Sequence, residues 1–331
     1  MATPDHPSPS RGRLVLAFAV AYLIWGTTYA AIRIGVLAWP PFLFVGLRFT
    51  LAGVVLLGFA RLRGEKLLLP RASWPPILIL AVLLIAVSNG LASWSEVSVP
   101  SDETALLGAT TALWITGLGA LGPHGTRLKR RGIVALFLGL VGSVLLLAPR
   151  NGWHAVPLAG YVAIMLSNLA WATGVLYGRR PRAAALPLLT GAGWQMLTGG
   201  ALLLVAGWSL GETQTFSWSL PGFLTMLYLA LAASTLTYTA YLWLVPRVSP
   251  LALGSVNYIN PLVAVVCGWW LLSERLDGLE IVGGAVVLLS VVLAIPNQRK
   301  SRPGPQPPTP GPSPLTGEAV LGTSALGEGG P

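Results

Sequence analysis

The feature that most constrains this sequence is the length of its apolar stretches, many of which approach or exceed about 18 residues. A helix of about 20 such residues crosses the ~30 Å hydrocarbon core of a bilayer. The chain is also poor in charge, with 10% charged residues against about 25% in soluble domains. So few charges would not cover a surface that faces water. We therefore expect an all-α integral membrane protein.

Apolar segments alternate with mostly short connections, and most segment boundaries carry Pro, Gly or a charged residue. We read the apolar run after the polar N-terminus as a retained first span rather than a cleaved signal peptide. Residues 1–13 and the Pro/Gly-rich tail at 297–331 are predicted to be disordered. The ten predicted spans are 14–32, 42–60, 75–95, 103–122, 132–149, 158–178, 186–208, 220–244, 251–272 and 279–296.

The distribution of Lys and Arg predicts an orientation. With the N-terminus in the cytoplasm, 17 of the 21 basic residues fall in cytoplasmic segments, whereas the acidic residues concentrate on the opposite side. This predicts a multi-pass protein with both termini in the cytoplasm. It also accounts for the net charge of +10 without nucleic acid. The excess of Arg over Lys is typical of a GC-rich bacterial genome, so we expect a bacterial plasma membrane.

Landmark residues recur at a constant offset of 146 positions. The repeat divides the spans into a first half, 14–149, and a second half, 158–296, with five spans each. Because five is odd, the second half enters the membrane from the opposite side. We therefore predict ten transmembrane helices arranged as two inverted five-helix repeats, an architecture that places transporter substrates near the midplane. The matched pairs include Trp25 and Trp171, Pro41 and Pro187, Pro75 and Pro221, and Pro100 and Pro246.

Enzyme and metal motifs are absent from the sequence. It has no P-loop, no Gly-x-Ser-x-Gly and no His-Glu-x-x-His, and its three histidines lack metal-ligand spacing. The single cysteine, Cys267, excludes an intrachain disulfide. We expect no enzymatic activity, no cofactor and no metal. Since no ATP-binding domain is present, transport would draw on an ion gradient or on the gradient of the substrate itself.

Three stretches of the chain resemble the drug/metabolite transporter superfamily, in particular its ten-helix EamA-type members. They are "WGTTYAAIRIGVLAWPPFLFVGLRFTLAG" (25–53), "NGLASWSEVSVPSDETALLGATTALW" (89–114) and "NPLVAVVCGWWLLSERLDGLEIVGG" (260–284). The resemblance covers roughly 14–296 and implies transport of small metabolites, often export, with a central cavity between the halves.

The sequence departs from the family pattern in two places. Ala112 stands where the first half would carry a proline matching Pro261, so we expect a less kinked first half. The Gly-Glu-Arg turn that follows the ninth span, here Ser-Glu-Arg, has no equivalent after the fourth.

Polar residues interrupt the apolar run "GSVNYINPLVAVV" (254–266), which contains Asn257, Tyr258, Asn260 and Pro261. Proline lacks an N–H and its ring crowds the carbonyl four residues earlier, here that of Asn257. In hydrocarbon a freed carbonyl needs a partner or water. One interpretation is a broken helix that exposes polar groups to a substrate cavity. The other is a structural kink whose amides bind neighbouring helices.

Arg48 is the basic residue predicted to lie within a span, at a cost of about 2.5–3.5 kcal/mol. It indicates a role in the transport path, with Glu96 as its candidate partner, unless it snorkels from the outer end. Asn89, Ser93 and Glu96 recur on one helical face, with Trp94 on its flank. This face is predicted to line the cavity, and Glu96 is a candidate proton site. The alternative is a helix end at which Glu96 meets water.

The repeat-matched Trp25 and Trp171, with Thr28 beside the first, would suit a cavity wall for amphipathic molecules or a packing contact. Gln195 and Tyr238 are further candidates for substrate binding. The expected partners are a small-molecule substrate and the lipid bilayer, and a homodimer is left open. We predict a secondary transporter of small organic metabolites, such as amino acids or related compounds, that works by alternating access, with export favoured. The alternative is a flippase for a lipid or lipid-linked intermediate.

Overall fold

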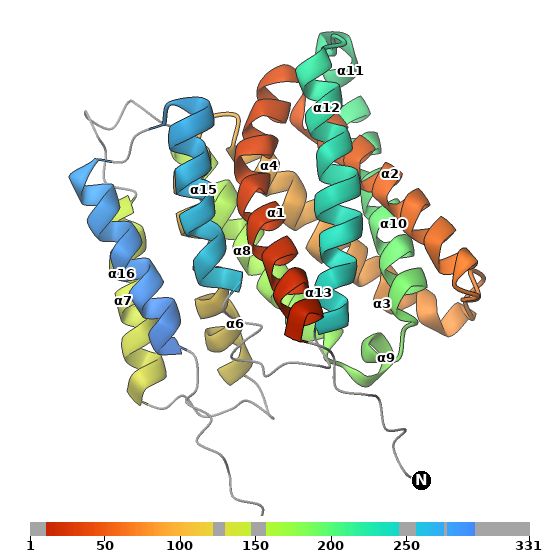
Figure 1. Cartoon of the computed structure of the whole chain (residues 1–331), viewed down its shortest axis with the longest axis horizontal. Helices are drawn as coiled ribbons and strands as arrows, with labels where there is room; N and C mark the ends of the chain where they lie inside the picture. The colour runs from red at the N-terminus through yellow and green to blue at the C-terminus, as the bar shows by residue number, and fades with distance from the viewer. Residues whose placement is uncertain (1–10, 122–129, 147–156, 245–255, 275–276, 295–331) are drawn as a thin grey trace, which may run out of the picture. The chain divides into compact units, whose positions relative to one another are not determined.

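The computed structural model describes residues 11–121, 130–146, 157–244, 256–274 and 277–294 (Figure 1). Over these residues the secondary structure is helical, without β-strands. Among the described residues, six helical segments are long and apolar enough to cross a membrane: Arg11–Ala38, Pro41–Leu62, Arg71–Ser95, Leu158–Gly178, Leu188–Ser209 and Leu220–Tyr241. The all-α membrane class is therefore confirmed, while ten crossings in an inverted repeat stay a prediction. Of the segments predicted to be disordered, 1–13 and 297–331, residues 1–10 and 297–331 lie outside the described residues, whereas residues 11–13 belong to the first turn of the Arg11–Ala38 helix.

The first half of the chain begins with two long helices, and its third helical segment changes type along its length. In order, the elements are α1 (Arg11–Ala38), α2 (Pro41–Leu62), the 3-10 turn η1 (Arg71–Ser73), α3 (Trp74–Leu80), the π-helix η2 (Ala81–Asn89), α4 (Gly90–Ser95), α5 (Ser101–Gly108), α6 (Thr111–Ala120) and α7 (Arg130–Leu146).

The second half repeats much of this order, including a π-helix within its third long segment. Its elements are α8 (Leu158–Gly178), α9 (Pro181–Ala184), α10 (Leu188–Ser209), α11 (Glu212–Thr215), α12 (Leu220–Tyr228), the π-helix η3 (Leu229–Thr237), α13 (Tyr238–Leu244), α15 (Val256–Leu272) and α16 (Gly278–Ala294).

Helix boundaries follow the prolines and glycines of the sequence. Pro41, Pro75 and Pro221 lie in the first turns of α2, α3 and α12. A proline suits this position because its fixed φ is helical and its missing N–H would have had no helical partner. After α2 and α10 the chain turns through Gly64 and Gly211, whose φ values of 81° and 77° favour glycine.

Helices that correspond in the two halves pack against each other. α2 lies along α10, and α7 lies along α16 (Figure 1). Glycines bring the first pair close: a Cβ added at Gly53 would lie 2.6 Å from the Leu197 amide nitrogen. One at Gly200 would lie 2.6 Å from the Thr50 nitrogen. Such small residues permit the close backbone packing that drives helix association in lipid.

The ends of α2 and α10 are joined by two carboxylates. Glu65, just after α2, accepts hydrogen bonds from the N–H and the hydroxyl of Thr190 at the start of α10. Glu212, just after α10, accepts from the N–H groups of Phe42 and Leu43 at the start of α2. Since the end of each helix meets the start of the other, α2 and α10 run antiparallel.

Two apolar clusters hold the bundle together. The larger lies among α1, α2, η2, α10 and η3, with Phe44, Leu56 and Leu229 fully buried. The smaller joins α5 to α8 and α16 through Leu107, Ile164 and Val287. Because both clusters combine residues of the first and second halves, neither half buries its apolar face alone.

The two π-helices are stabilised by side chains that bind their carbonyl groups. In η2 the Asn89 amide donates to the Leu84 carbonyl at 2.7 Å. In η3 the Thr235 hydroxyl donates to the Ala230 carbonyl at 2.9 Å, again five residues earlier. π-helical turns are rare and occur frequently at functional sites.

In the described part of the chain, the helix boundaries do not follow the presence of Pro261 in the second half or its absence from the first. Helix α15 continues through Pro261, so this proline does not end the helix. The fourth segment, which lacks a proline, is instead interrupted at Ala109 and Thr110, between α5 and α6. Side-chain hydrogen bonds explain this interruption, because the Thr110 hydroxyl and the Asn168 amide of α8 both donate to the Leu107 carbonyl, at 2.6 and 2.9 Å.

Candidate substrate site

Arg48 lies on α2 and is almost completely buried, with 5% of its surface exposed. Its Nε atom donates to the Ser234 hydroxyl of η3 at 3.1 Å, and its guanidinium lies 4.6 Å from the Phe49 ring centroid. Within the described residues its Nη1 atom has no hydrogen-bond partner. The side chain is therefore held inside the bundle rather than extended toward a membrane surface. It links the first half to the second.

Glu96 follows the last turn of α4, and its side chain is fully buried. Neither carboxylate oxygen has a hydrogen-bond partner in the described part of the chain. The charges of Arg33 and Arg48 attract this carboxylate, and the charge of Glu274 repels it. Arg33 of α1 also donates to the backbone carbonyl of Glu96. Arg48 thus acts on Glu96 electrostatically, while its hydrogen bond within the described residues goes to Ser234.

The predicted polar face runs from the end of η2 to the residue after α4, and it has both buried and exposed members. Ser93 is 1% exposed, and within the described residues its hydroxyl has no partner. Asn89 donates its amide to the Leu84 carbonyl, so it supports η2. Trp94, in contrast, is an exposed side chain of α4, with 37% of its surface accessible. Ser93 and Glu96 are therefore the residues of this face whose polar groups stay available to bind a ligand, as far as the described residues show.

Among the predicted aromatic residues, Trp25 packs α1 against η3 and α13. The Trp25 N–H donates to the Ala233 carbonyl at 3.1 Å, and its ring lies 5.0 Å from that of Tyr241. The Thr28 hydroxyl donates to the Trp25 carbonyl at 2.6 Å. Tyr238 packs against the larger apolar cluster. The contacts of Trp25 are packing contacts between the two halves of the chain, whereas the Thr28 hydrogen bond lies within α1.

The other predicted site residues are more scattered. Trp171 is half-buried on α8, and Gln195 is buried on α10. In the part of the chain that the structure describes, no hydrogen bond joins either residue to Arg48 or Glu96. Asn260 lies on α15, where its Oδ1 atom is buried without a partner among the described residues. The side chains of Asn257 and Tyr258 lie outside the described residues.

Sequence analysis missed Tyr228 and Ser234, which join this group from the second half. The Tyr228 hydroxyl lies 2.5 Å from that of Thr27, and Tyr228 interacts electrostatically with Arg48. Both residues belong to a third segment with several hydroxyls among apolar residues. The signal was present in that pattern, but it did not indicate which hydroxyl faces Arg48.

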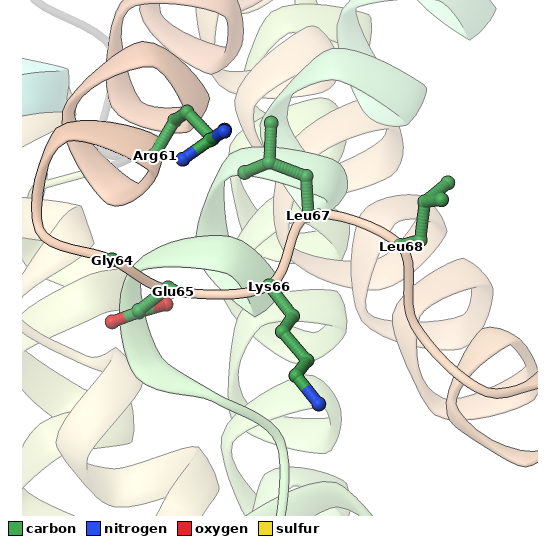
Figure 2. A pocket seen from close by; sticks show the side chains of 6 residues that line it. All are labelled: Arg61, Gly64, Glu65, Lys66, Leu67 and Leu68. Atoms are coloured by element: carbon green, nitrogen blue, oxygen red, sulfur yellow. The ribbon is translucent and has the colours of Figure 1, made fainter.

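A separate surface pocket of about 410 Å³ lies in the loop after α2 (Figure 2). Its polar side chains do not converge, because Arg61, Glu65 and Lys66 point in different directions (Figure 2). The carboxylate of Glu65 is already bound to Thr190. This hollow is therefore distinct from the buried group around Arg48 and Glu96. Its lining residues are Arg61, Gly64, Glu65, Lys66, Leu67 and Leu68.

The model of the EamA-like transporter family matches the chain twice, over residues 12–148 and 158–295. The chain belongs to the EamA-like transporter family. The resemblance drawn from the sequence is thereby confirmed. As an EamA-type protein it is a membrane transporter that contains two copies of the family domain.

Several curated relatives of this EamA-type protein span most of its length. The uncharacterised inner membrane transporter YedA of Escherichia coli strain K12 is 37% identical over 289 residues, covering 84% of this chain and 89% of the relative. Protein PecM of Dickeya dadantii is 28% identical, covering 82% and 88%. A probable amino-acid metabolite efflux pump of Escherichia coli strain K12 is 25% identical, covering 86% and 95%.

The helical architecture of this EamA-type chain also occurs in a solved structure. A crystal structure with 24% sequence identity aligns with a TM-score of 0.62, covering 86% of this chain and 97% of the other. At this identity the similarity shows the fold alone.

Proposed function

We propose that this EamA-type protein is a secondary transporter of small organic metabolites and that Arg48, Ser93 and Glu96 form part of its substrate site. The observation that carries the proposal is that a basic and an acidic side chain, Arg48 and Glu96, are both buried and each has a polar atom without a partner among the described residues. A charge within a membrane protein is costly, so it is retained where it serves a substrate or ion path. Export by alternating access across the plasma membrane, with both termini in the cytoplasm, is the form of transport we favour.

The chemistry of these groups indicates the class of substrate. The guanidinium of Arg48 can donate a hydrogen bond to a carboxylate, and the Glu96 carboxylate can accept one from an ammonium group. A zwitterion such as an amino acid or a related metabolite satisfies both groups at once. The relative named as a probable amino-acid metabolite efflux pump supports this class. Water would fill the same positions when the substrate is absent.

The antiparallel pair of α2 and α10 supports an inverted repeat. These helices correspond in the two halves, and each ends where the other begins. Correspondence with opposite direction is what a two-fold axis in the membrane plane produces. In such transporters the halves rock around a site near the midplane, which opens alternately to the two faces. The Arg48–Ser234 contact between the halves would lie near that pivot.

Counterflow in proteoliposomes tests this function. Purified protein is reconstituted into vesicles preloaded with unlabelled amino acids and related metabolites, and entry of the matching labelled compound is measured. We expect exchange of at least one zwitterionic metabolite, and we expect Arg48→Ala to reduce it to the level of protein-free vesicles. Arg61→Ala is the matched control, because Arg61 is an exposed arginine on the same helix. Both variants are checked for monodispersity before reconstitution.

The same vesicles distinguish a lipid flippase from a metabolite transporter. A fluorescent phospholipid placed in both leaflets is quenched by dithionite from outside, so flipping raises the quenched fraction above one half. Lipid flipping without exchange of any soluble metabolite would overturn the proposed function. Exchange that survives Arg48→Ala would instead remove Arg48 from the substrate site.

A further inference from the structure

We propose that Glu274 is a latch that closes one end of the transport path by binding the start of α5. Glu274 lies in the turn between α15 and α16 of the second half, whereas α5 belongs to the first half. The inference rests on the alternating-access function proposed above, because a latch matters only if the halves move. Its test uses no substrate, so the two proposals can fail separately.

The latch consists of three hydrogen bonds to one carboxylate. Glu274 accepts from the Ser101 N–H at 3.0 Å, from the Ser101 hydroxyl at 2.6 Å and from the Asp102 N–H at 3.4 Å. The first N–H groups of a helix have no partner within the helix, and the helix dipole favours a negative charge there. A carboxylate from the other half therefore completes the start of α5. Hydrogen bonds to an ionised acceptor are stronger than neutral ones.

The backbone of the turn is built to deliver this carboxylate. Ser273 has a φ of 57°, a left-handed conformation that is uncommon for residues other than glycine. It reverses the chain so that the Glu274 N–H returns to the Gly268 carbonyl at 3.1 Å. A Cβ atom at Gly268 would lie 2.4 Å from Glu274 Oε2 and 3.3 Å from the Ser101 hydroxyl oxygen. Gly268 therefore provides the space in which the carboxylate reaches α5.

The latch is close to the candidate substrate site. The charge of Glu274 acts on Glu96, five residues before Ser101 along the chain. The segment between them passes Pro100, which begins the turn into α5. α5 also packs against α1 and α15. Release of Glu274 would therefore free the α4–α5 connection that carries Glu96, and with it the closure at this end of the site.

The latch has no acidic counterpart at the corresponding place in the first half. The sequence contains no Asp or Glu between Glu103 and Glu212, so the connection after α6 carries no carboxylate. The carboxylates on α2 and α10, in contrast, are reciprocal, since Glu65 and Glu212 each bind the other helix. A contact present in one half alone favours one closed state over its mirror image. The latch thus biases the resting transporter toward closure at the Glu274 end.

Cysteine accessibility tests the latch without transport. Ser93→Cys is placed in a Cys267→Ser background, and labelling by a membrane-impermeant maleimide is timed from each face of the membrane. We expect Glu274→Gln to raise the labelling rate about tenfold from one face only, through the loss of charge-assisted hydrogen bonds. Gly268→Ala should do the same, because it displaces the carboxylate while keeping its charge. Ser101→Ala, which keeps the two N–H donors, should give a smaller increase.

Glu212→Gln is the matched control, since it also removes a carboxylate from a helix start, yet α2 stays packed along α10. Its labelling rate should stay within about twofold of the parent, as expected when one capping contact is lost without opening. A Glu274→Gln rate equal to that of the parent in folded protein would overturn the latch. An equal increase in the control would also overturn it. If Glu274→Gln does not fold, Gly268→Ala and Ser101→Ala decide by the same criterion.

Discussion

The Glu65 carboxylate binds Thr190 twice, accepting its N–H at 2.9 Å and its hydroxyl at 2.8 Å. Glu65 follows α2, and Thr190 begins α10, the corresponding helix of the second half. One carboxylate thereby provides an N-terminal cap across the repeat. Glu212 repeats the arrangement in the opposite direction at the start of α2. The interface between the halves is thus specified by polar contacts at its ends and by glycines along its length.

Loss of this cap should lower stability. We expect Glu65→Gln to reduce the free energy of unfolding by about 1–2 kcal/mol, because a charged acceptor is removed from two donors and from the positive end of a helix dipole. Thermal unfolding in detergent measures the change, with Lys66→Gln as an exposed neighbouring control. Thr190→Ala combined with Glu65→Gln should cost less than the sum of the single changes. Full additivity would contradict the contact.

Substitution by alanine should have opposite effects on stability at Gly53 and Gly58, which lie on the same helix, α2. Gly53→Ala should destabilise the protein by more than about 1 kcal/mol, because the new Cβ would meet the backbone of α10, which cannot rotate away as a side chain can. Gly58→Ala meets nothing within 4 Å and should stabilise by about 0.5–1 kcal/mol through helix propensity. Paired melting curves check the difference in sign. Equal effects would mean that α2 and α10 do not approach so closely.

Ser234 should contribute to stability because its hydroxyl accepts a hydrogen bond from the buried Arg48 guanidinium. Ser234→Ala leaves the Arg48 Nε donor without the hydroxyl at 3.1 Å, which should cost about 1–3 kcal/mol of stability. Ser209→Ala is the control, since that hydroxyl is exposed and binds a carbonyl of its own helix. Denaturation of both variants in the same detergent compares them. If the two variants are equally stable, Arg48 does not depend on Ser234.

Asn168 should hold the interruption between α5 and α6. Asn168→Leu removes the donor to the Leu107 carbonyl at 2.9 Å and to the Thr110 hydroxyl at 3.2 Å. A buried group that loses its partner costs about 1–3 kcal/mol, so the melting temperature should fall. Thr173→Val, on the same helix, changes an exposed hydroxyl that binds its own turn and should have little effect. A stability as high as the parent's would show that the interruption needs no support from α8.

Several features of the fold were predictable because they are properties of short stretches. The prolines Pro41 and Pro221 indicated helix starts, and helices begin there. At Pro261 the helix is not broken, because a proline within a membrane helix is tolerated when its surroundings satisfy the backbone. The break at Thr110 was not predictable, since its partner Asn168 lies 58 positions further along the chain. No local pattern around Thr110 contains that information.

The sequence by itself determined that this is a helical membrane protein of the EamA-like transporter family, because apolar length and family motifs are read along the chain. It also identified Arg48 and Glu96 as costly groups that need an explanation. Only the tertiary structure decided which polar groups are satisfied and which remain available. Arg48 meets Ser234 across 186 positions, while Glu96 is buried with no partner among the described residues. Hydrogen bonding depends on distance and angle between helices, which packing sets and sequence order does not.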